Sequence, residues 1–208
     1  MNGVAPALTP SIFLGFALAY LVGAIPVGFV VARFLGGLDL RRSGSGNIGA
    51  TNVLRTLGKL PAIVTLLGDM AKGYIAVSVA GAIIPARWGA SAGAALAVIG
   101  NCWPVFLRFH GGKGVATGFG AFLALTPWAT APAALVWLVV TASFRFVSLA
   151  SVMACLCLPL GVALLGYPWS SVVAALITGV IIIVRHRANL LRLASGREPR
   201  LGERSSGA

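Results

Sequence analysis

Apolar stretches of about 20 residues alternate along the whole chain with short loops that carry glycine and arginine. A helix needs about 20 apolar residues to cross a bilayer, so these stretches predict membrane-spanning helices. We assign seven spans, the fourth of them short: Ser11–Ala32, Leu60–Pro85, Trp88–Leu107, Val115–Thr126, Trp128–Phe144, Val147–Leu165 and Trp169–Val184. The pattern therefore predicts an all-α integral membrane protein.

The number of spans depends on residues 115–144, which contain no charged side chain. As one helix this stretch would be about 45 Å long, whereas the hydrocarbon core of a bilayer is about 30 Å thick. Pro127 lacks the N–H that a helix interior needs, so a break is expected there. Residues 1–10 have no positive region or convincing cleavage pattern, so we expect the first span to be a retained helix and not a signal peptide.

The charge distribution favours seven spans, with the N-terminus outside and the C-terminus in the cytoplasm. Of 16 Lys and Arg residues, Arg87 then lies outside and Lys72 within a span. Six spans would put Arg145 and the arginine-rich tail outside, against the enrichment of Lys and Arg in cytoplasmic loops. Seven spans place the other 14 on the cytoplasmic side: Arg33, Arg41, Arg42, Arg55, Lys59, Arg108, Lys113, Arg145, Arg185, Arg187, Arg192, Arg197, Arg200 and Arg204.

Composition agrees with a membrane protein, because 58% of residues are hydrophobic and 10% are charged. Soluble domains carry about 25% charged residues. The net charge of +12 is explained by the positive-inside rule and by anionic lipid headgroups, so nucleic acid is not an expected partner. The three cysteines show no zinc-ligand spacing, and we expect no metal and no organic cofactor. Residues 1–198 are expected to form one domain, and residues 199–208 a short, flexible polar tail.

Three loops on the predicted cytoplasmic side combine glycines with a cation. The first runs from Arg41 to Arg55 and has glycines in G-x-G-x-x-G order, but no strand precedes it, so a dinucleotide fold is not expected. Glycines still let backbone N–H groups approach an anion, and a following helix N-terminus favours negative charge. The alternative is a flexible loop with ordinary arginines. We predict a substrate site with Ser45 as a catalytic residue and these ligands: Gly44, Gly46, Asn47, Gly49, Thr51, Asn52 and Arg55.

The second loop, Gly100–Thr117, contains the run Gly-Gly-Lys-Gly at residues 111–114. It is not an ATP-binding P-loop, because Lys113 is followed by glycine and not by Ser or Thr. A lysine among glycines at the start of a helix is a suitable clamp for a phosphate or an oxyanion. The alternative is a tight turn that obeys the charge rule. The predicted residues are Lys113 as catalytic, with Gly111, Gly112, Gly114 and Thr117 as ligands.

In the third segment, Arg185–Glu198, three polar residues recur at a spacing of three and should share a helical face: His186, Asn189 and Arg192. His186 is the better of the two histidines as a proton carrier and is predicted to be catalytic, with Asn189 and Arg192 as substrate ligands. Glu198 is expected to pair with an arginine. The alternative is an amphipathic helix lying on anionic lipid.

Asp69 and Lys72 lie near the middle of the second span at positions i and i+3. Charges inside a membrane are usually paired or functional, so we favour a structural pair that borders the site over a proton relay.

Together these residues resemble the acyl-phosphate-dependent glycerol-3-phosphate acyltransferase family of bacteria, the PlsY family, over nearly the whole chain. The resemblance implies transfer of a fatty acyl group from acyl phosphate to the sn-1 hydroxyl of glycerol 3-phosphate, giving lysophosphatidate and inorganic phosphate. This reaction belongs to phospholipid biosynthesis at the inner membrane. The implied partners are both substrates, membrane lipid and other phospholipid-synthesis enzymes.

By position, the resemblance assigns Ser45 and Arg55 to the substrate site, and it aligns the family's lysine and its histidine–asparagine pair with Lys113, His186 and Asn189. Arg185 and Asn101 are expected to border the site. The family has histidine where this chain has Asn101 and commonly has lysine where it has His110. Asparagine forms hydrogen bonds but is no base at neutral pH. The acceptor of the hydroxyl proton is left open between a substrate phosphate oxygen and His186.

Other functions are less consistent with the sequence. Acyl-CoA-dependent acyltransferases carry a His-x-x-x-x-Asp pair, whereas the fifth residues after His110 and His186 are Val115 and Leu191. A transporter or channel for an anionic solute would use the mid-bilayer pair Asp69 and Lys72. A membrane scaffold without catalysis would not explain three loops that each place glycines beside a cation.

Overall fold

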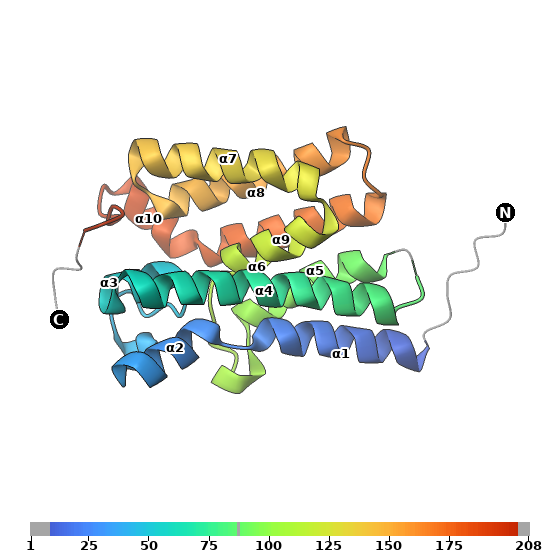
Figure 1. The fold of residues 1–208 in the computed structure, drawn as a ribbon. Helices are drawn as coiled ribbons and strands as arrows, with labels where there is room; N and C mark the ends of the chain where they lie inside the picture. Colours follow the sequence, from blue (N-terminus) through green and yellow to red (C-terminus); the bar gives the residue numbers. More distant parts are fainter. Residues whose placement is uncertain (1–8, 87, 204–208) are drawn as a thin grey trace.

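The computed structural model describes residues 9–86 and 88–203, and every regular element in this part of the chain is helical (Figure 1). Arg87 and Arg204, which enter the predicted charge distribution, and residues 205–208 of the predicted tail lie outside the described residues. Two elements are 3₁₀ turns, η1 (Leu40–Arg42) and η2 (Val105–Leu107). The α-helices are α1 (Pro10–Ala24), α2 (Val27–Gly36), α3 (Ala50–Leu57), α4 (Lys59–Ile83), α5 (Gly89–Cys102), α6 (Val115–Leu125), α7 (Pro127–Phe144), α8 (Val147–Leu164), α9 (Trp169–Arg185) and α10 (Arg187–Ala194).

The long helices run roughly along one common axis (Figure 1). Helix α1 packs against α4 and α5, and α4 also packs against α6. Helix α9 contacts both α5 and α8, and α7 packs mainly on α8. The bundle begins with α1 at one end, and α3 and α10 lie at the other end (Figure 1). The first and third of the segments singled out in the sequence therefore adjoin the same end of the bundle (Figure 1).

Most of the predicted spans are found as helices, and the break expected near Pro127 separates α6 from α7. The first span was expected to be one helix and is instead divided, because α1 ends at Ala24 and α2 begins at Val27. Pro26 explains this break, since proline has no N–H and disfavours helical geometry in the residue before it. The carbonyl of Ile25 at the break accepts a hydrogen bond from the Lys72 ammonium at 2.7 Å.

Span lengths within the described residues leave the number of crossings as a prediction. Helices α9 and α10 could form a span together but are bent by 56°. Helix α6 has 11 residues and is about 16 Å long, about half the thickness of the hydrocarbon core. Five segments are long and apolar enough to cross a membrane: Pro10–Gly36, Lys59–Ile83, Gly89–Leu107, Pro127–Phe144 and Val147–Leu164.

Glycines bring two pairs of helices into close contact. Gly73 of α4 lies against the Thr117 carbonyl of α6, and Gly120 of α6 lies against the Met70 carbonyl of α4. Between α1 and α5, Gly23 and Gly100 likewise lie against the backbone of the other helix. Without side chains, helix backbones can approach closely, which is a common packing mode of membrane helices. The α4–α6 contact places the buried Asp69–Lys72 segment beside the start of α6.

A methyl group at Gly120 should destabilise the bundle, because it would overlap the Met70 backbone, which cannot move aside as a flexible side chain can. We expect Gly120→Ala to lower the unfolding free energy by about 1–3 kcal/mol, measured by thermal or denaturant unfolding in detergent. Gly161→Ala is the matched control, because the nearest atoms to its new methyl group lie 3.5 Å or more away. Equal stability of the two variants would contradict the close packing of α4 on α6.

Candidate active site

The three glycine-containing segments meet at one cavity of roughly 900 Å³. This volume lies in the upper part of the range for small-molecule sites. Its polar lining comes from the loops and helix ends and includes Ser45, Asn47, Thr51, Arg55, Lys113, His186, Asn189 and Arg192. Its apolar lining comes mainly from helices α6 to α9 and includes Phe119, Phe122, Trp137, Leu138, Leu158 and Ile182. The cavity can therefore accept a ligand with a charged head and an apolar tail.

Asn52 organises the first loop from inside. Its side chain is 2% exposed, and Nδ2 donates to the carbonyls of Ser43 and Asn47 at 3.0 and 2.7 Å. Its Oδ1 accepts from the Ser45 N–H at 2.9 Å. The Asn47 amide oxygen in turn accepts from the Gly49 N–H at 2.8 Å. The Asn52 amide is therefore engaged with the loop backbone, the residue also lines the cavity, and its role as a substrate ligand stays a prediction.

Two glycines allow the backbone of this loop to adopt its turns. Gly44 and Gly46 have φ angles of +58° and +71°, a region that glycine adopts at low energy. Gly46 does not line the cavity, whereas Gly44 does. Helix α3 starts directly after the loop and places Thr51 and Arg55 four residues apart, on one face. The loop therefore offers Ser45, Thr51 and Arg55 to a ligand.

The second loop is held by its neighbours on both sides. The Gly112 N–H donates to the Asn101 carbonyl at 2.9 Å. From α9, the Arg185 guanidinium donates to the Gly112 and Gly111 carbonyls at 3.1 and 3.0 Å. Gly111 packs against the Asn101 carbonyl, where a side chain would collide. Gly111 and Arg185 do not line the cavity, so they position the loop, and Gly112, Lys113 and Gly114 form its cavity-facing part.

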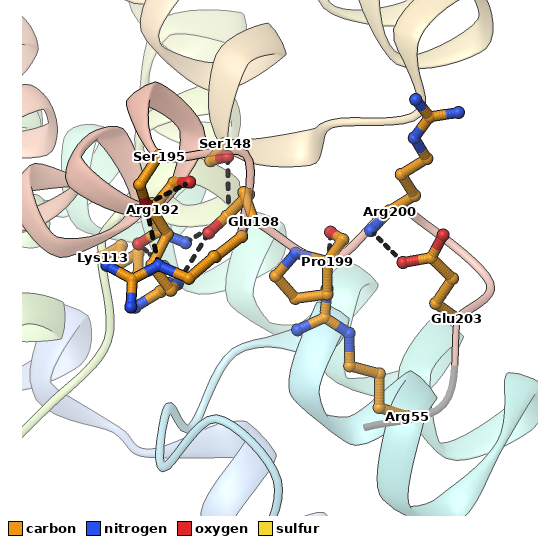
Figure 2. A network of polar contacts seen from close by, with 11 residues as sticks. Arg55, Lys113, Ser148, Arg192, Ser195, Glu198, Pro199, Arg200 and Glu203 are labelled. Atoms are coloured by element: carbon orange, nitrogen blue, oxygen red, sulfur yellow. Dashed lines mark hydrogen bonds and ion pairs between the residues drawn. The ribbon is translucent and has the colours of Figure 1, made fainter. Parts of the chain in front are cut away.

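One carboxylate joins the second and third segments (Figure 2). Lys113 Nζ donates to Asn189 Oδ1 at 2.6 Å, and Asn189 Nδ2 donates to Glu198 Oε1 at 2.6 Å. The same carboxylate accepts from Ser148 Oγ at 2.8 Å and from Arg192 Nε at 2.9 Å. Glu198 thus connects α8, α10 and the C-terminal segment to the lysine of the second loop.

The charges of this cluster follow from burial and from their partners. Burial lowers the pKa of Lys113 to about 8; Glu198 opposes this shift, and Arg192, Arg55 and Arg185 add to it. Burial alone would raise the pKa of Glu198, but hydrogen bonds from Asn189, Ser148 and Arg192 lower it below its ordinary value. At neutral pH the cluster therefore holds a carboxylate and an ammonium, and the ammonium loses its proton around pH 8.

His186 lies at the bend between α9 and α10 and is 3% exposed. Its Nδ1 is 2.8 Å from the Ile182 carbonyl, which can only accept, so this nitrogen carries the proton. Burial, followed by the charge of Lys113, lowers the pKa of His186 to about 4. The ring is consequently neutral at pH 7, and Nε2 is left as a hydrogen-bond acceptor.

Lys72 is fully hydrogen-bonded within the protein. Its ammonium lies 2.8 Å from Asp69 Oδ1, 2.7 Å from the Ile25 carbonyl and 2.9 Å from Asn101 Oδ1. An ammonium has three N–H groups, and each of these acceptors can take one. Asp69 lines the cavity and Lys72 does not. This arrangement is that of a structural pair.

Three buried polar atoms that belong to cavity-lining residues lack a hydrogen-bond partner among the described residues. Arg55 Nε, Thr117 Oγ1 and Thr178 Oγ1 are buried and accept or donate no hydrogen bond within residues 9–86 and 88–203. Leaving such a group unsatisfied costs about 1–3 kcal/mol. In the same part of the chain, no group of three or more His, Cys, Asp or Glu side chains is placed to hold a metal ion.

Residues 197–203 contribute contacts that the sequence did not reveal. Arg55 Nη2 donates to the Pro199 carbonyl at 3.4 Å (Figure 2), and Arg145 Nη2 donates to the Leu201 carbonyl at 2.7 Å. Ser148, which binds Glu198, was also not predicted. A serine near a helix start and a short charged tail are common features, so no sequence signal marked either one. The apolar lining was likewise hidden among ordinary span residues.

Comparison with known proteins gives consistent matches. The family model described as glycerol-3-phosphate acyltransferase matches residues 13–196. The glycerol-3-phosphate acyltransferase of Jannaschia sp. is 47% identical, over 95% of this chain and 97% of the relative. That of Desulforudis audaxviator is 45% identical, over 93% and 98%.

Two solved structures of PlsY (YgiH), an integral membrane glycerol 3-phosphate acyltransferase, share the fold. The glycerol 3-phosphate form is 40% identical with a TM-score of 0.87, and the lysophosphatidic acid form is 39% identical with a TM-score of 0.86. Both comparisons cover 92% of this chain and 96% of the PlsY chain. The chain therefore belongs to the glycerol-3-phosphate acyltransferase family and is an integral membrane protein.

Proposed function

We propose that this acyltransferase uses acyl phosphate as donor and acylates the sn-1 hydroxyl of glycerol 3-phosphate, releasing lysophosphatidate and inorganic phosphate. The observation that carries the proposal is the single cavity in which cations from three segments adjoin an apolar lining between helices. Two anionic heads fit the first part and an acyl chain the second. The forms in which PlsY was solved, with glycerol 3-phosphate and with lysophosphatidic acid, correspond to a substrate and a product of this reaction.

In this proposal Arg55 and Lys113 screen the repulsion between the two phosphates, and Ser45 and Thr51 add neutral donors. The free N–H groups at the start of α6, next to Lys113, favour negative charge as well. Alignment of two reactants in a fixed geometry supplies much of the acceleration, and donors aimed at developing negative charge supply more. His186, Asn189 and Arg192 add further polar groups to the lining of the same cavity.

The sn-1 hydroxyl oxygen attacks the acyl carbon, the bond from that carbon to the phosphate oxygen breaks, and phosphate leaves. Acyl phosphate is an activated mixed anhydride, so no covalent intermediate on the protein is required. His186 Nε2 accepts the hydrogen bond of the attacking hydroxyl and orients it. Because the pKa of His186 is lowered to about 4, a substrate phosphate oxygen is the better final acceptor of the proton.

We further propose seven crossings in the bacterial inner membrane, with the N-terminus outside, the C-terminus cytoplasmic and residues 1–198 as one domain. An odd number of crossings is supported by the position of α1 and α10 at opposite ends of the bundle (Figure 1). Contact with other phospholipid-synthesis enzymes would let the product pass directly to the next step. The transporter hypothesis gains no support, because each N–H of Lys72 has an acceptor within the protein.

The donor can be tested with purified protein in lipid, supplied with palmitoyl phosphate and glycerol 3-phosphate. We expect phosphate release that requires glycerol 3-phosphate and no product from palmitoyl-CoA. Arg55→Ala should fold but lose about 10²-fold in kcat/KM, since one charged donor at the reacting anions is removed. Product from the thioester, or phosphate release without glycerol 3-phosphate, would contradict the proposal.

Lys113 should make substrate capture pH-dependent. Above its pKa of about 8 the free enzyme loses this positive charge, so kcat/KM should fall as the pH rises from 7 to 9. In Lys113→Arg the guanidinium stays charged, and the fall should be absent from a profile of initial rates. Parallel profiles for the wild type and the variant would show that Lys113 does not hold the anion.

His186 variants separate orientation from proton transfer. If Nε2 only orients the hydroxyl, His186→Ala loses one hydrogen bond and kcat falls about tenfold. His186→Gln, whose amide oxygen also accepts, should recover part of this rate. A loss of about 10³-fold or more would identify His186 as the general base, and full activity of His186→Ala would exclude both roles.

A further inference from the structure

Asn101, in the last turn of α5, has a side chain whose orientation is fixed by Lys72. The residue is 6% exposed, and its Oδ1 accepts from Lys72 Nζ at 2.9 Å. An ammonium can only donate, so the amide oxygen and not the amide nitrogen must face it. The ammonium is itself held by Asp69 and Ile25 at 2.8 and 2.7 Å. The orientation of the Asn101 amide is therefore fixed, because a flipped amide would place its NH₂ group against the ammonium, and both groups are donors.

The amide nitrogen consequently faces the second loop. A Cβ built on Gly112 would lie 2.9 Å from Asn101 Nδ2, so the absent side chain of Gly112 is what leaves room for these N–H groups. Asn101, Gly112 and Lys113 all line the cavity. No hydrogen-bond acceptor for Asn101 Nδ2 is found among residues 9–86 and 88–203, although its Oδ1 is occupied.

Asn101 is also connected to the second loop, which carries Lys113, through a backbone hydrogen bond. The Asn101 carbonyl accepts from the Gly112 N–H at 2.9 Å, one residue before Lys113. The same residue thus anchors the loop through its backbone and presents two unengaged N–H groups through its side chain. A buried donor pair beside a cation, on the wall of a cavity, is the arrangement that stabilises an oxyanion.

We propose that Asn101 Nδ2 donates a hydrogen bond to a phosphoryl or carbonyl oxygen of the bound substrates, next to Lys113, with Lys72 as the positioning residue. This inference rests on the proposed function and adds a binding and catalytic residue to it. Asn101 takes up and releases no proton. It acts as a neutral donor, which strengthens the site without bringing another buried charge close to Lys113.

Three variants test the donor. Asn101→Asp keeps an acceptor for Lys72 and removes the N–H groups, and Asn101→Ala removes them without adding charge. Both should lose about 10²-fold in kcat/KM with palmitoyl phosphate and glycerol 3-phosphate. Asn101→His can accept from Lys72 on one ring nitrogen and donate from the other, so it should stay within about tenfold of the wild type. Thermal unfolding in detergent verifies that each variant is folded.

The kinetic parameters identify the oxygen that is bound. A higher KM for glycerol 3-phosphate alone places the donor on that substrate, and a higher KM for acyl phosphate alone places it on the other. A lower kcat with unchanged KM values places it on the carbonyl oxygen as negative charge develops there. A purely structural role would change stability without such a split.

The proposal is overturned if folded Asn101→Asp and Asn101→Ala both remain within threefold of the wild type, because Asn101 would then only hold Lys72. It is also overturned if folded Asn101→His is as slow as Asn101→Asp. Wild-type turnover in the same assay distinguishes a failure of the proposed function from a failure of the role proposed for Asn101. A wild type that is inactive with acyl phosphate speaks against the proposed function, whereas losses confined to the variants concern Asn101.

Discussion

Positive charge held at the wall of a membrane cavity is the constraint on which the rest of the structure depends. The chain has 16 Lys and Arg residues and four acidic residues, and two of those acids, Asp69 and Glu198, are buried. Each buried carboxylate holds one cation in an ion pair. Arg55 and Lys113 form no ion pair within the described residues and line the cavity. Both are partly buried, and a partly desolvated cation without an ion-pair partner is unfavourable, so we propose that anionic substrates complete the site.

The same constraint explains features that lie away from the cavity. The break in the first span exposes the Ile25 carbonyl, and this carbonyl becomes one of three acceptors for the buried Lys72. Because the other acceptors come from α4 and α5, the ammonium ties three spans together at one depth. The close contact of α4 with α6 then fixes the start of α6, next to Lys113, relative to the Lys72 ammonium. The geometry of the polar site is thus set by contacts inside the bundle.

Hydropathy alone located most helices within a few residues, as at Val147–Leu165, which was found as α8 at Val147–Leu164. Proline predicted helix breaks less reliably, because Pro26 interrupts the first span whereas Pro132 and Pro159 lie inside the continuous helices α7 and α8. At the break before Pro26, the Ile25 carbonyl accepts a hydrogen bond from Lys72 of another span, a contact that the local sequence does not show. The glycine-rich motifs contribute residues to one cavity, and the roles of Arg55, Lys113 and His186 in it stay predictions.

What the sequence could not predict are contacts between distant positions. Asn52 is a polar residue of the type that binds ligands, and its side chain also forms hydrogen bonds that hold the backbone of its own loop. Ser148 binds Glu198 across 50 positions of the chain, and neither residue has a local pattern that indicates the other. The orientation of the Asn101 amide likewise depends on Lys72, which is 29 positions away. Such roles follow from tertiary packing and become visible only in the folded bundle.

The central claim is direct transfer between two aligned anions, without a covalent intermediate on the protein. Isotope exchange tests it most directly: the enzyme is incubated with palmitoyl phosphate and labelled inorganic phosphate in the absence of glycerol 3-phosphate. Direct transfer predicts that no label enters palmitoyl phosphate, because phosphate leaves only when the alcohol attacks. Incorporation of label at a rate comparable with turnover would demonstrate an acyl-enzyme and contradict this account.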